Sequence, residues 1–205
     1  PKLPLMTLGG MAGGAFLCLL SLMVSNSLNT KVKDKNDLVG LVSLPLAGEL
    51  PLLSGKERKK LPLVVINSRS FMEECFHTEL LLLPNPEKAS RVVFLTSTRT
   101  GEGKTFTALN LAAAYAQTGK KVLLIDGDLR KASLSAFCGG KNSRGLAHLL
   151  MNPLASPDSV LQSGENFPGF DIVPAGPVPP NPAALLTQGR FEDLIRYWRT
   201  RYDRI

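Results

Sequence analysis

A glycine-rich loop between two apolar runs constrains this chain more than any other feature. Val92 to Thr96 has the composition of a strand buried on both faces. Thr105 to Gln117 is rich in Ala and Leu and stops before Gly119, as a helix does. The loop between them, residues 98–105, reads TRTGEGKT. Glycines allow the backbone N–H groups of such a loop to wrap a phosphate, and the N-terminus of the following helix adds a favourable dipole. The order therefore predicts a phosphate-binding loop.

The side chains of this loop extend the prediction to a nucleotide. Lys104 is placed to reach the β- and γ-phosphates, and the Thr105 hydroxyl to ligate Mg²⁺. The loop follows the pattern G-x-x-x-x-G-K-[ST], except that Thr98 occupies the first glycine position. A glycine-rich turn with a chance Lys-Thr pair is the alternative. The residues expected to bind nucleotide are Gly101, Glu102, Gly103, Lys104, Thr105 and Phe106.

A second apolar run, Val122 to Ile125, ends in Asp126 and Asp128. Strand, helix and strand in this order predict a βαβ unit with parallel strands. Ligands of such sheets bind beyond the carboxyl ends of the strands, so both carboxylates are expected in the same crevice as the loop. They suit Mg²⁺, which takes one or two carboxylates together with phosphate and water. Asp126 could alternatively accept a proton from an attacking hydroxyl. An exposed acidic turn is the other interpretation, which suits a lone Asp better than this pair.

The N-terminal segment predicts a transmembrane helix. Leu3 to Thr30 contains no charged residue, and a bilayer core needs about 20 apolar helical residues. A signal peptide fits less well, because the apolar run is long and no small-residue cleavage site ends it. Three lysines within residues 31–35 follow the run, which places its C-terminal side in the cytoplasm.

The expected fold class is α/β: a P-loop type, mostly parallel sheet flanked by helices and preceded by one transmembrane helix. We divide the chain into a membrane segment (1–30), a juxtamembrane segment and basic linker (31–68) and a nucleotide-binding domain (69–205). Helices are expected at 145–151, at 158–162, from Asn181-Pro182 onward and at 190–201, and a strand at 170–173.

Composition excludes some functions. The net charge is +7, but the basic cluster at residues 56–60 has no interleaved aromatic residues to stack on bases, so we expect no nucleic-acid partner. The three cysteines, at positions 18, 75 and 138, lack zinc or C-x-x-C spacing. The two histidines are isolated, so a metal or catalytic role for them is not expected.

The order GEGKT (101–105), helix and LLIDGDLR (123–130) resembles the deviant P-loop ATPases. Within them the chain is similar to the cytoplasmic kinase domain of the bacterial tyrosine autokinases of capsule and exopolysaccharide synthesis. The resemblance covers nearly the whole chain. It includes the start PKLP, residues 44–51, Gly145-Leu146, the run PNPAALL at 180–186 and the closing Tyr202-Asp203.

The resemblance implies a membrane-anchored protein-tyrosine kinase that uses ATP and Mg²⁺ and regulates the chain length and export of a polysaccharide. Lys104, Asp126 and Asp128 would be catalytic, and Thr105 and the two aspartates would hold the metal. The resemblance also implies these partners: inner-membrane lipid, other subunits of the same protein, the polysaccharide polymerase and export machinery, and a tyrosine phosphatase. The nucleotide-binding domain would lie in the cytoplasm.

Three departures from the family pattern limit this expectation. The third nucleotide motif, a strand ending in Asp, would begin at Arg204-Ile205, so we expect a fragment with two parts of a three-part active site. Residues 1–205 contain no tyrosine-rich tail, and Tyr115, Tyr197 and Tyr202 are interpreted as packing residues. The stretch 71–80 lacks the arginines of the family's ring-forming helix. Two alternatives stay open: a partitioning-type membrane ATPase switch, and a polysaccharide co-polymerase scaffold with a degenerate nucleotide site.

Overall fold

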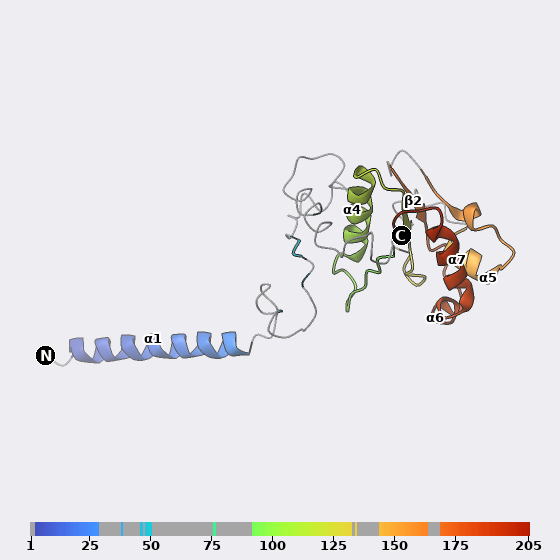
Figure 1. Ribbon diagram of the computed structural model, residues 1–205. Coiled ribbons are helices and arrows are strands. Elements are labelled where there is room, and N and C mark those ends of the chain that lie inside the picture. The colour runs from blue at the N-terminus through green and yellow to red at the C-terminus, as the bar shows by residue number, and fades with distance from the viewer. Residues whose placement is uncertain are drawn as a thin grey trace. The chain divides into compact units, whose positions relative to one another are not determined.

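A computed structural model of the chain describes residues 3–28, 38, 46, 48–50, 76, 92–132, 134, 144–163 and 169–205. The chain divides into two compact units, Pro1–Leu46 and Ala47–Ile205 (Figure 1). Most of the juxtamembrane segment and linker expected at 31–68, and residues 77–91, lie outside the described residues.

The first unit contains one helix, α1 (Leu3–Ser27), among its described residues. Its apolar side chains are exposed, as at Phe16 and Leu17. Among the residues that the structure describes, none of the helices has the length and apolar character needed to cross a bilayer. The predicted transmembrane helix is therefore not supported. That prediction rested on the absence of charge over residues 3–30 and on the almost wholly apolar or glycine stretch from Leu5 to Val24, which has the length of about 20 residues that a bilayer core needs.

The second unit is built around two parallel strands, β1 (Val122–Ile125) and β2 (Phe170–Val173). Val122 pairs with Phe170, and the register continues to Ile125 with Val173. Both strands have the bounds that the sequence predicts. Their residues are mostly apolar at successive positions, as expected for strands covered on both faces.

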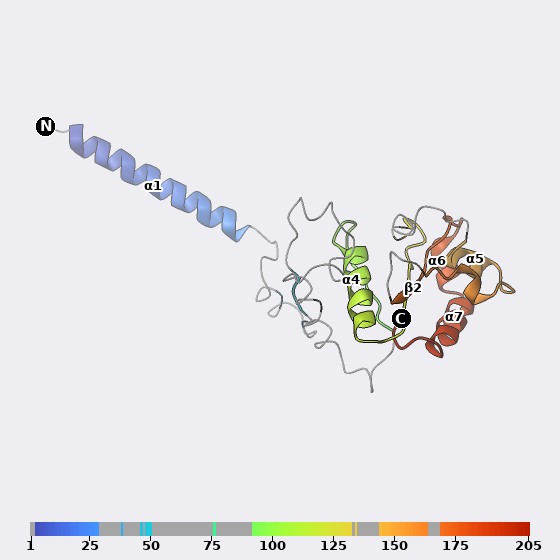
Figure 2. The same ribbon diagram turned by 90° about the horizontal axis from the view of Figure 1, so that it is seen from above.

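Helices cover both faces of these strands (Figure 2). Val122, Leu124, Phe170 and Ile172 pack with α4 (Lys104–Gln117) in one apolar cluster. Leu123, Ile125 and Val173 pack on the other side with residues of α5 (Leu146–Met151) and α7 (Gly189–Arg199). The alternation follows from the pleat, which sends successive side chains to opposite faces. The α/β class with a parallel sheet flanked by helices is confirmed.

The last residues of the chain join the same sheet. Arg204 forms a parallel bridge with Val122, and Leu123 N donates to Arg204 O at 2.9 Å. On the other side Val93 N donates to Ile205 O at 2.8 Å. Residues 204–205 therefore lie between β1 and the segment that leads into the glycine-rich loop. That segment, predicted as a strand over Val92–Thr96, is extended chain attached by this bond and is not a strand by its hydrogen bonding.

The bounds of the remaining elements lie within one or two residues of the predicted ones. The helix predicted at 158–162 is a short 3₁₀ helix. The remaining elements are α5 (Leu146–Met151), the 3₁₀ helix η2 (Pro157–Val160), α6 (Pro182–Leu186) and α7 (Gly189–Arg199). The amphipathic α7 buries Leu194 and Trp198. The start of α5 is fixed against the end of β2, because Leu146 N donates to Pro174 O at 2.7 Å.

Only one residue of the stretch 71–80 is described. Phe76 is helical and 1% exposed, and its ring centroid lies 6.1 Å from that of Phe106 at the start of α4. This position is therefore part of the core on the α4 face.

Candidate nucleotide-binding site

The glycine-rich loop has the backbone conformation that its sequence requires. Gly101 has φ of 90° and Gly103 has φ of 95°, a left-handed region that glycine adopts without a steric penalty. Gly103 is also the N-cap of α4, so the loop leads directly into the helix N-terminus. A Cβ built on either glycine would have no heavy atom within 4 Å beyond its chain neighbours. Glycine is therefore needed here for the backbone angle, and the space around both α-carbons is open.

Hydrogen bonds to the Glu102 side chain close the first half of the loop. Thr98 Oγ1 donates to Glu102 Oε1 at 3.2 Å, and Arg99 N donates to Glu102 Oε2 at 3.0 Å. The bond from the Arg99 backbone is the main reason that the pKa of Glu102 lies below its ordinary value. Thr98 does not have a positive φ; among the described non-glycine residues only Ala132 does. The backbone at position 98 therefore does not require glycine, and the Thr98 side chain stabilises the loop through its bond to Glu102.

Lys104 lies at the base of the loop as the first residue of α4. Its Nζ donates to Ser97 Oγ at 2.7 Å. Within the part of the chain that the structure describes, no carboxylate lies within salt-bridge distance of this ammonium group. Thr105 and Phe106 continue the first turn, and Phe106 is partly buried on the core cluster of α4. The uncompensated charge of Lys104, beside the N-terminus of a 14-residue helix, favours an anion at this place.

Asp126 holds the loop that follows β1. It is only 5% exposed, and its own N–H donates to Val173 O at 2.9 Å. Its Oδ1 accepts from Asp128 N and its Oδ2 from Leu134 N, each at 3.1 Å. Burial raises the pKa of Asp126, while these two backbone bonds favour the ionised form. A carboxylate with both oxygens engaged by backbone N–H groups shapes the loop.

Asp128 is less buried and less engaged. Its Oδ1 accepts from Arg130 N at 3.3 Å and from Lys131 N at 3.2 Å. No hydrogen bond within the described residues involves its second oxygen, Oδ2. Ala132 N donates to Asp128 O at 2.9 Å, and the turn ends with Ala132 at φ of 46°. The structure therefore leaves one oxygen of Asp128 open to a ligand.

These side chains fit magnesium as a metal shared with a bound nucleotide. Among the described residues, no group of three or more His, Cys, Asp or Glu could hold a metal ion by itself. Mg²⁺ does not need such a group, because it usually takes one or two carboxylates and completes its shell with phosphate and water. Asp128 Oδ2 suits direct ligation, and Asp126 suits orientation of the loop. The Thr105 hydroxyl on α4 is the third oxygen that the sequence predicts.

One side chain joins the two loops. Lys131 Nζ donates to Thr100 Oγ1 at 3.0 Å, across 31 positions of sequence. The contact brings the acidic turn after β1 to the rim of the glycine-rich loop, as the sequence predicts for two loops at the same edge of a parallel sheet. Sequence reasoning did not identify Lys131 or Ser97. The signal available for Lys131 was its place directly after the run DGDLR (126–130).

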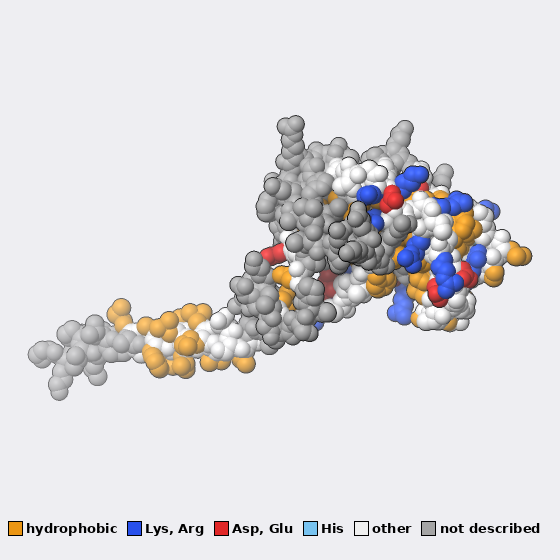
Figure 3. Space-filling model, in the orientation of Figure 1, with side chains coloured by type: hydrophobic (Ala, Val, Ile, Leu, Met, Phe, Trp, Pro, Cys, Tyr) orange, Lys and Arg blue, Asp and Glu red, His pale blue; other side chains and the backbone are white. Residues whose placement is uncertain are grey.

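The charged side chains on the surface bear on the expectation that the protein has no nucleic-acid partner. On the face seen in Figure 3, Lys and Arg side chains of the second unit are interspersed with Asp and Glu and do not form a continuous basic stripe. Arg99 and Arg130 are exposed.

With the loop, the acidic turn and the parallel strands in place, the class of the protein can be stated. Residues 93–196, just over half of the chain, match the family model described as the CobQ/CobB/MinD/ParA nucleotide binding domain. The chain belongs to this family of P-loop domains.

Within this family its relatives are bacterial tyrosine kinases. It is 39% identical over 119 residues to tyrosine-protein kinase YwqD of Bacillus subtilis, covering 58% of this chain and 49% of the relative. Tyrosine-protein kinase ptk of Acinetobacter johnsonii is 27% identical and covers all of this chain, but only 29% of that relative is matched. The chain spans between 15% and 58% of the length of such relatives.

Solved structures agree with the sequence matches. The kinase domain of the Escherichia coli tyrosine kinase ETK has a TM-score of 0.75 and 26% identity, with 85% of this chain and 71% of that chain covered. The chimerical protein CapA2B2 has a TM-score of 0.71 and 30% identity, with 83% and 73% covered. The predicted resemblance to bacterial tyrosine autokinases is confirmed.

Proposed function

We propose that this chain carries the ATP-binding site of a bacterial protein-tyrosine kinase, which transfers the γ-phosphoryl group of ATP to a tyrosine hydroxyl. The observation that carries the proposal is the meeting of the glycine-rich loop with the acidic turn through Lys131 and Thr100. Phosphoryl transfer depends mainly on positioning and on stabilising negative charge. Both are available here, because Lys104, which has no carboxylate partner among the described residues, begins the helix after the loop, and Lys131 joins that loop to the turn of Asp126 and Asp128.

Each residue has a role in this proposal. The backbone of residues 101–103 wraps the phosphates, and Lys104 exchanges its bond with Ser97 for the β- and γ-phosphates. When bound, Mg²⁺ neutralises charge on the phosphates, and Thr105 and Asp128 would hold it. Asp126 keeps the turn in place, and its raised pKa favours accepting a proton from the attacking hydroxyl. Phe106 anchors the first turn of α4 on the core.

The wider role follows the resemblance to autokinases of polysaccharide synthesis. We propose a kinase at the bacterial inner membrane, with residues 69–205 as its cytoplasmic nucleotide-binding domain and residues 31–68 as a linker. It would regulate the chain length and export of a capsular or exopolysaccharide. Its partners would be other copies of the protein, the polysaccharide polymerase and export machinery, and a tyrosine phosphatase. The relatives named as tyrosine-protein kinases support the enzymatic part, and one of them is named as lying in a cps region of Klebsiella pneumoniae.

The structure bears on one of the alternatives. Two departures in the sequence keep a scaffold with a degenerate nucleotide site open: the missing first loop glycine and the missing arginines in residues 71–80. Thr98 fills that position without a left-handed backbone and fastens the loop through Glu102. The loop geometry therefore favours a working site over a degenerate one.

The test is phosphotyrosine formation. The purified protein is mixed with ATP, MgCl₂ and a glutamate–tyrosine copolymer as acceptor, and phosphotyrosine is measured by mass spectrometry. Because residues 1–205 are expected to hold two parts of a three-part active site, the assay uses the natural full-length protein that contains them, and we expect product from it and none from its Lys104→Ala variant. Exposed Lys120, at the other end of α4, provides a matched control as Lys120→Ala. ATP binding without any phosphotyrosine would refute the kinase and leave an ATPase switch.

A further inference from the structure

We propose that Lys131 is a second phosphate-binding cation of this site, and that its bond to Thr100 is the resting position of a side chain that pairs with the nucleotide. The inference depends on the proposed nucleotide binding. It adds a residue from the acidic turn to the contacts that the glycine-rich loop makes with phosphate.

The turn presents Lys131 toward the loop. Asp128 Oδ1 accepts the N–H groups of Arg130 and Lys131, and Asp128 O accepts the N–H of Ala132. These bonds set the backbone of Lys131, and its side chain then reaches Thr100 at the loop rim. The carboxylate expected near the metal therefore also fixes the position of this lysine.

Charge points to an anionic ligand. Lys104 and Lys131 each donate to a neutral hydroxyl, Ser97 Oγ and Thr100 Oγ1. In the described ranges neither ammonium group has a carboxylate within salt-bridge distance. The nearest acidic residue in the loop sequence, Glu102, is engaged by the Arg99 N–H and the Thr98 hydroxyl. Two lysines thus adjoin one loop without a paired negative charge.

A phosphate is a better partner than a hydroxyl for such a lysine. The bond to Thr100 pairs a charged donor with a neutral acceptor, whereas a phosphate oxygen adds the attraction of the opposite charge. Lys131 is exposed, so exchanging Thr100 for a phosphate oxygen breaks only one exposed bond. Lys104 approaches from α4 and Lys131 from the turn after β1, so the two charges come from different elements.

The test compares charge with hydrogen-bonding capacity at one position. Lys131→Gln keeps an N–H donor, on a side chain one bond shorter, but removes the charge, and Lys131→Arg keeps the charge. Lys120→Gln is the matched control, because it lies beyond the other end of α4, about 20 Å along the helix. Binding of Mg-ATP to each full-length variant is measured by isothermal titration calorimetry at low and at moderate salt.

We expect Lys131→Gln to weaken ATP binding roughly tenfold at low salt and less at moderate salt, since an exposed charge pair is screened. Lys131→Arg and Lys120→Gln should bind like the wild type. If Lys131→Gln binds ATP as tightly as the wild type while Lys104→Ala does not bind, the inference is refuted and nucleotide binding stands. A loss that Lys131→Arg does not restore would also contradict a role for charge. A wild type that binds no ATP would overturn the proposed function itself.

Discussion

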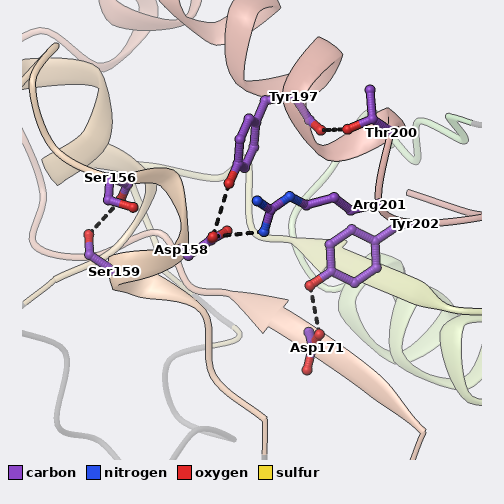
Figure 4. Close-up of polar contacts among 8 residues, drawn as sticks. All are labelled: Ser156, Asp158, Ser159, Asp171, Tyr197, Thr200, Arg201 and Tyr202. Atoms are coloured by element: carbon purple, nitrogen blue, oxygen red, sulfur yellow. Dashed lines mark hydrogen bonds and ion pairs between the residues drawn. The ribbon is translucent and has the colours of Figure 1, made fainter.

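Replacing Tyr202 by Phe should destabilise the protein more than replacing Tyr197, although both hydroxyls donate to an aspartate. Tyr202 Oη donates to Asp171 Oδ2 at 2.6 Å, and Tyr197 Oη donates to Asp158 Oδ2 at 2.9 Å (Figure 4). The first bond is half-buried and joins the chain just before residues 204–205 to strand β2. The second lies on the surface, where Arg201 also binds Asp158 at 2.8 Å.

The expected size of the effect follows from these surroundings. A hydrogen bond to a charged acceptor contributes about 1.5–3 kcal/mol to stability. Without Tyr202 Oη, Asp171 still accepts from Ser163 and remains accessible to water. We therefore expect a loss near the lower end, about 1.5 kcal/mol, for Tyr202→Phe. Tyr197→Phe leaves Asp158 with Arg201 in an exposed pair and should not measurably change the stability.

The same contact predicts a pH dependence. Burial, and then the bond to Asp171, raise the pKa of Tyr202 above its ordinary value. The folded protein therefore holds this proton more tightly than the unfolded chain does. The stabilisation is fully present below the unfolded pKa of about 10 and is lost as the pH rises beyond it. Between about pH 9 and about pH 11 the wild type should lose stability more steeply than Tyr202→Phe.

Urea unfolding followed by tryptophan fluorescence measures both effects, because the only tryptophan, Trp198, is fully buried in the second unit. Tyr197→Phe is the matched control. The reasoning is refuted if Tyr202→Phe unfolds at the wild-type urea concentration, or if the two variants lose the same stability.

Three further substitutions test the loops and the packing behind the site. Ala132→Gly should stabilise the protein by about 1 kcal/mol, measured as a higher melting temperature, because Ala132 has φ of 46°. A melting temperature below that of the wild type would contradict the left-handed turn. Gly145→Ala should cost about 2–3 kcal/mol in urea unfolding, because its Cβ would lie 2.4 Å from Gly176 N and from Pro174 O; unchanged stability would mean that the two segments do not approach so closely. Asp126→Ala should cost roughly 2 kcal/mol or more in thermal unfolding, because it leaves two backbone N–H groups without their acceptor, and a neutral effect would show that water replaces it.

The parts of the fold that depend on local sequence could be predicted. β1 and β2 have the predicted bounds because short apolar runs between turn residues specify buried strands. α4 begins one residue earlier than expected, at Lys104, because Gly103 with its positive φ caps the helix. Gly119, with φ of 78°, directly follows the C-cap Thr118, so α4 stops before this glycine as predicted.

The parts that depend on distant partners could not. The segment 92–96 has the composition of a strand, but its bond from Val93 N goes to Ile205 O, more than a hundred positions later. The contact between Lys131 and Thr100 has no periodic signal, because each residue lies in a loop. Absence of charge in residues 3–30 predicted a membrane-crossing helix that the structure does not support. Local patterns specify elements and glycine-rich turns, whereas side-chain contacts between loops depend on the assembled sheet.

The most direct test of the account is calorimetric titration of the intact chain with ATP in the presence of Mg²⁺, beside Lys104→Ala. The account predicts that the wild type binds one ATP and that Lys104→Ala weakens binding at least tenfold, since it removes a charge-assisted contact at the loop. Equal binding by the two proteins, or no binding by the folded wild type, would contradict the assignment of residues 98–105 as the nucleotide site.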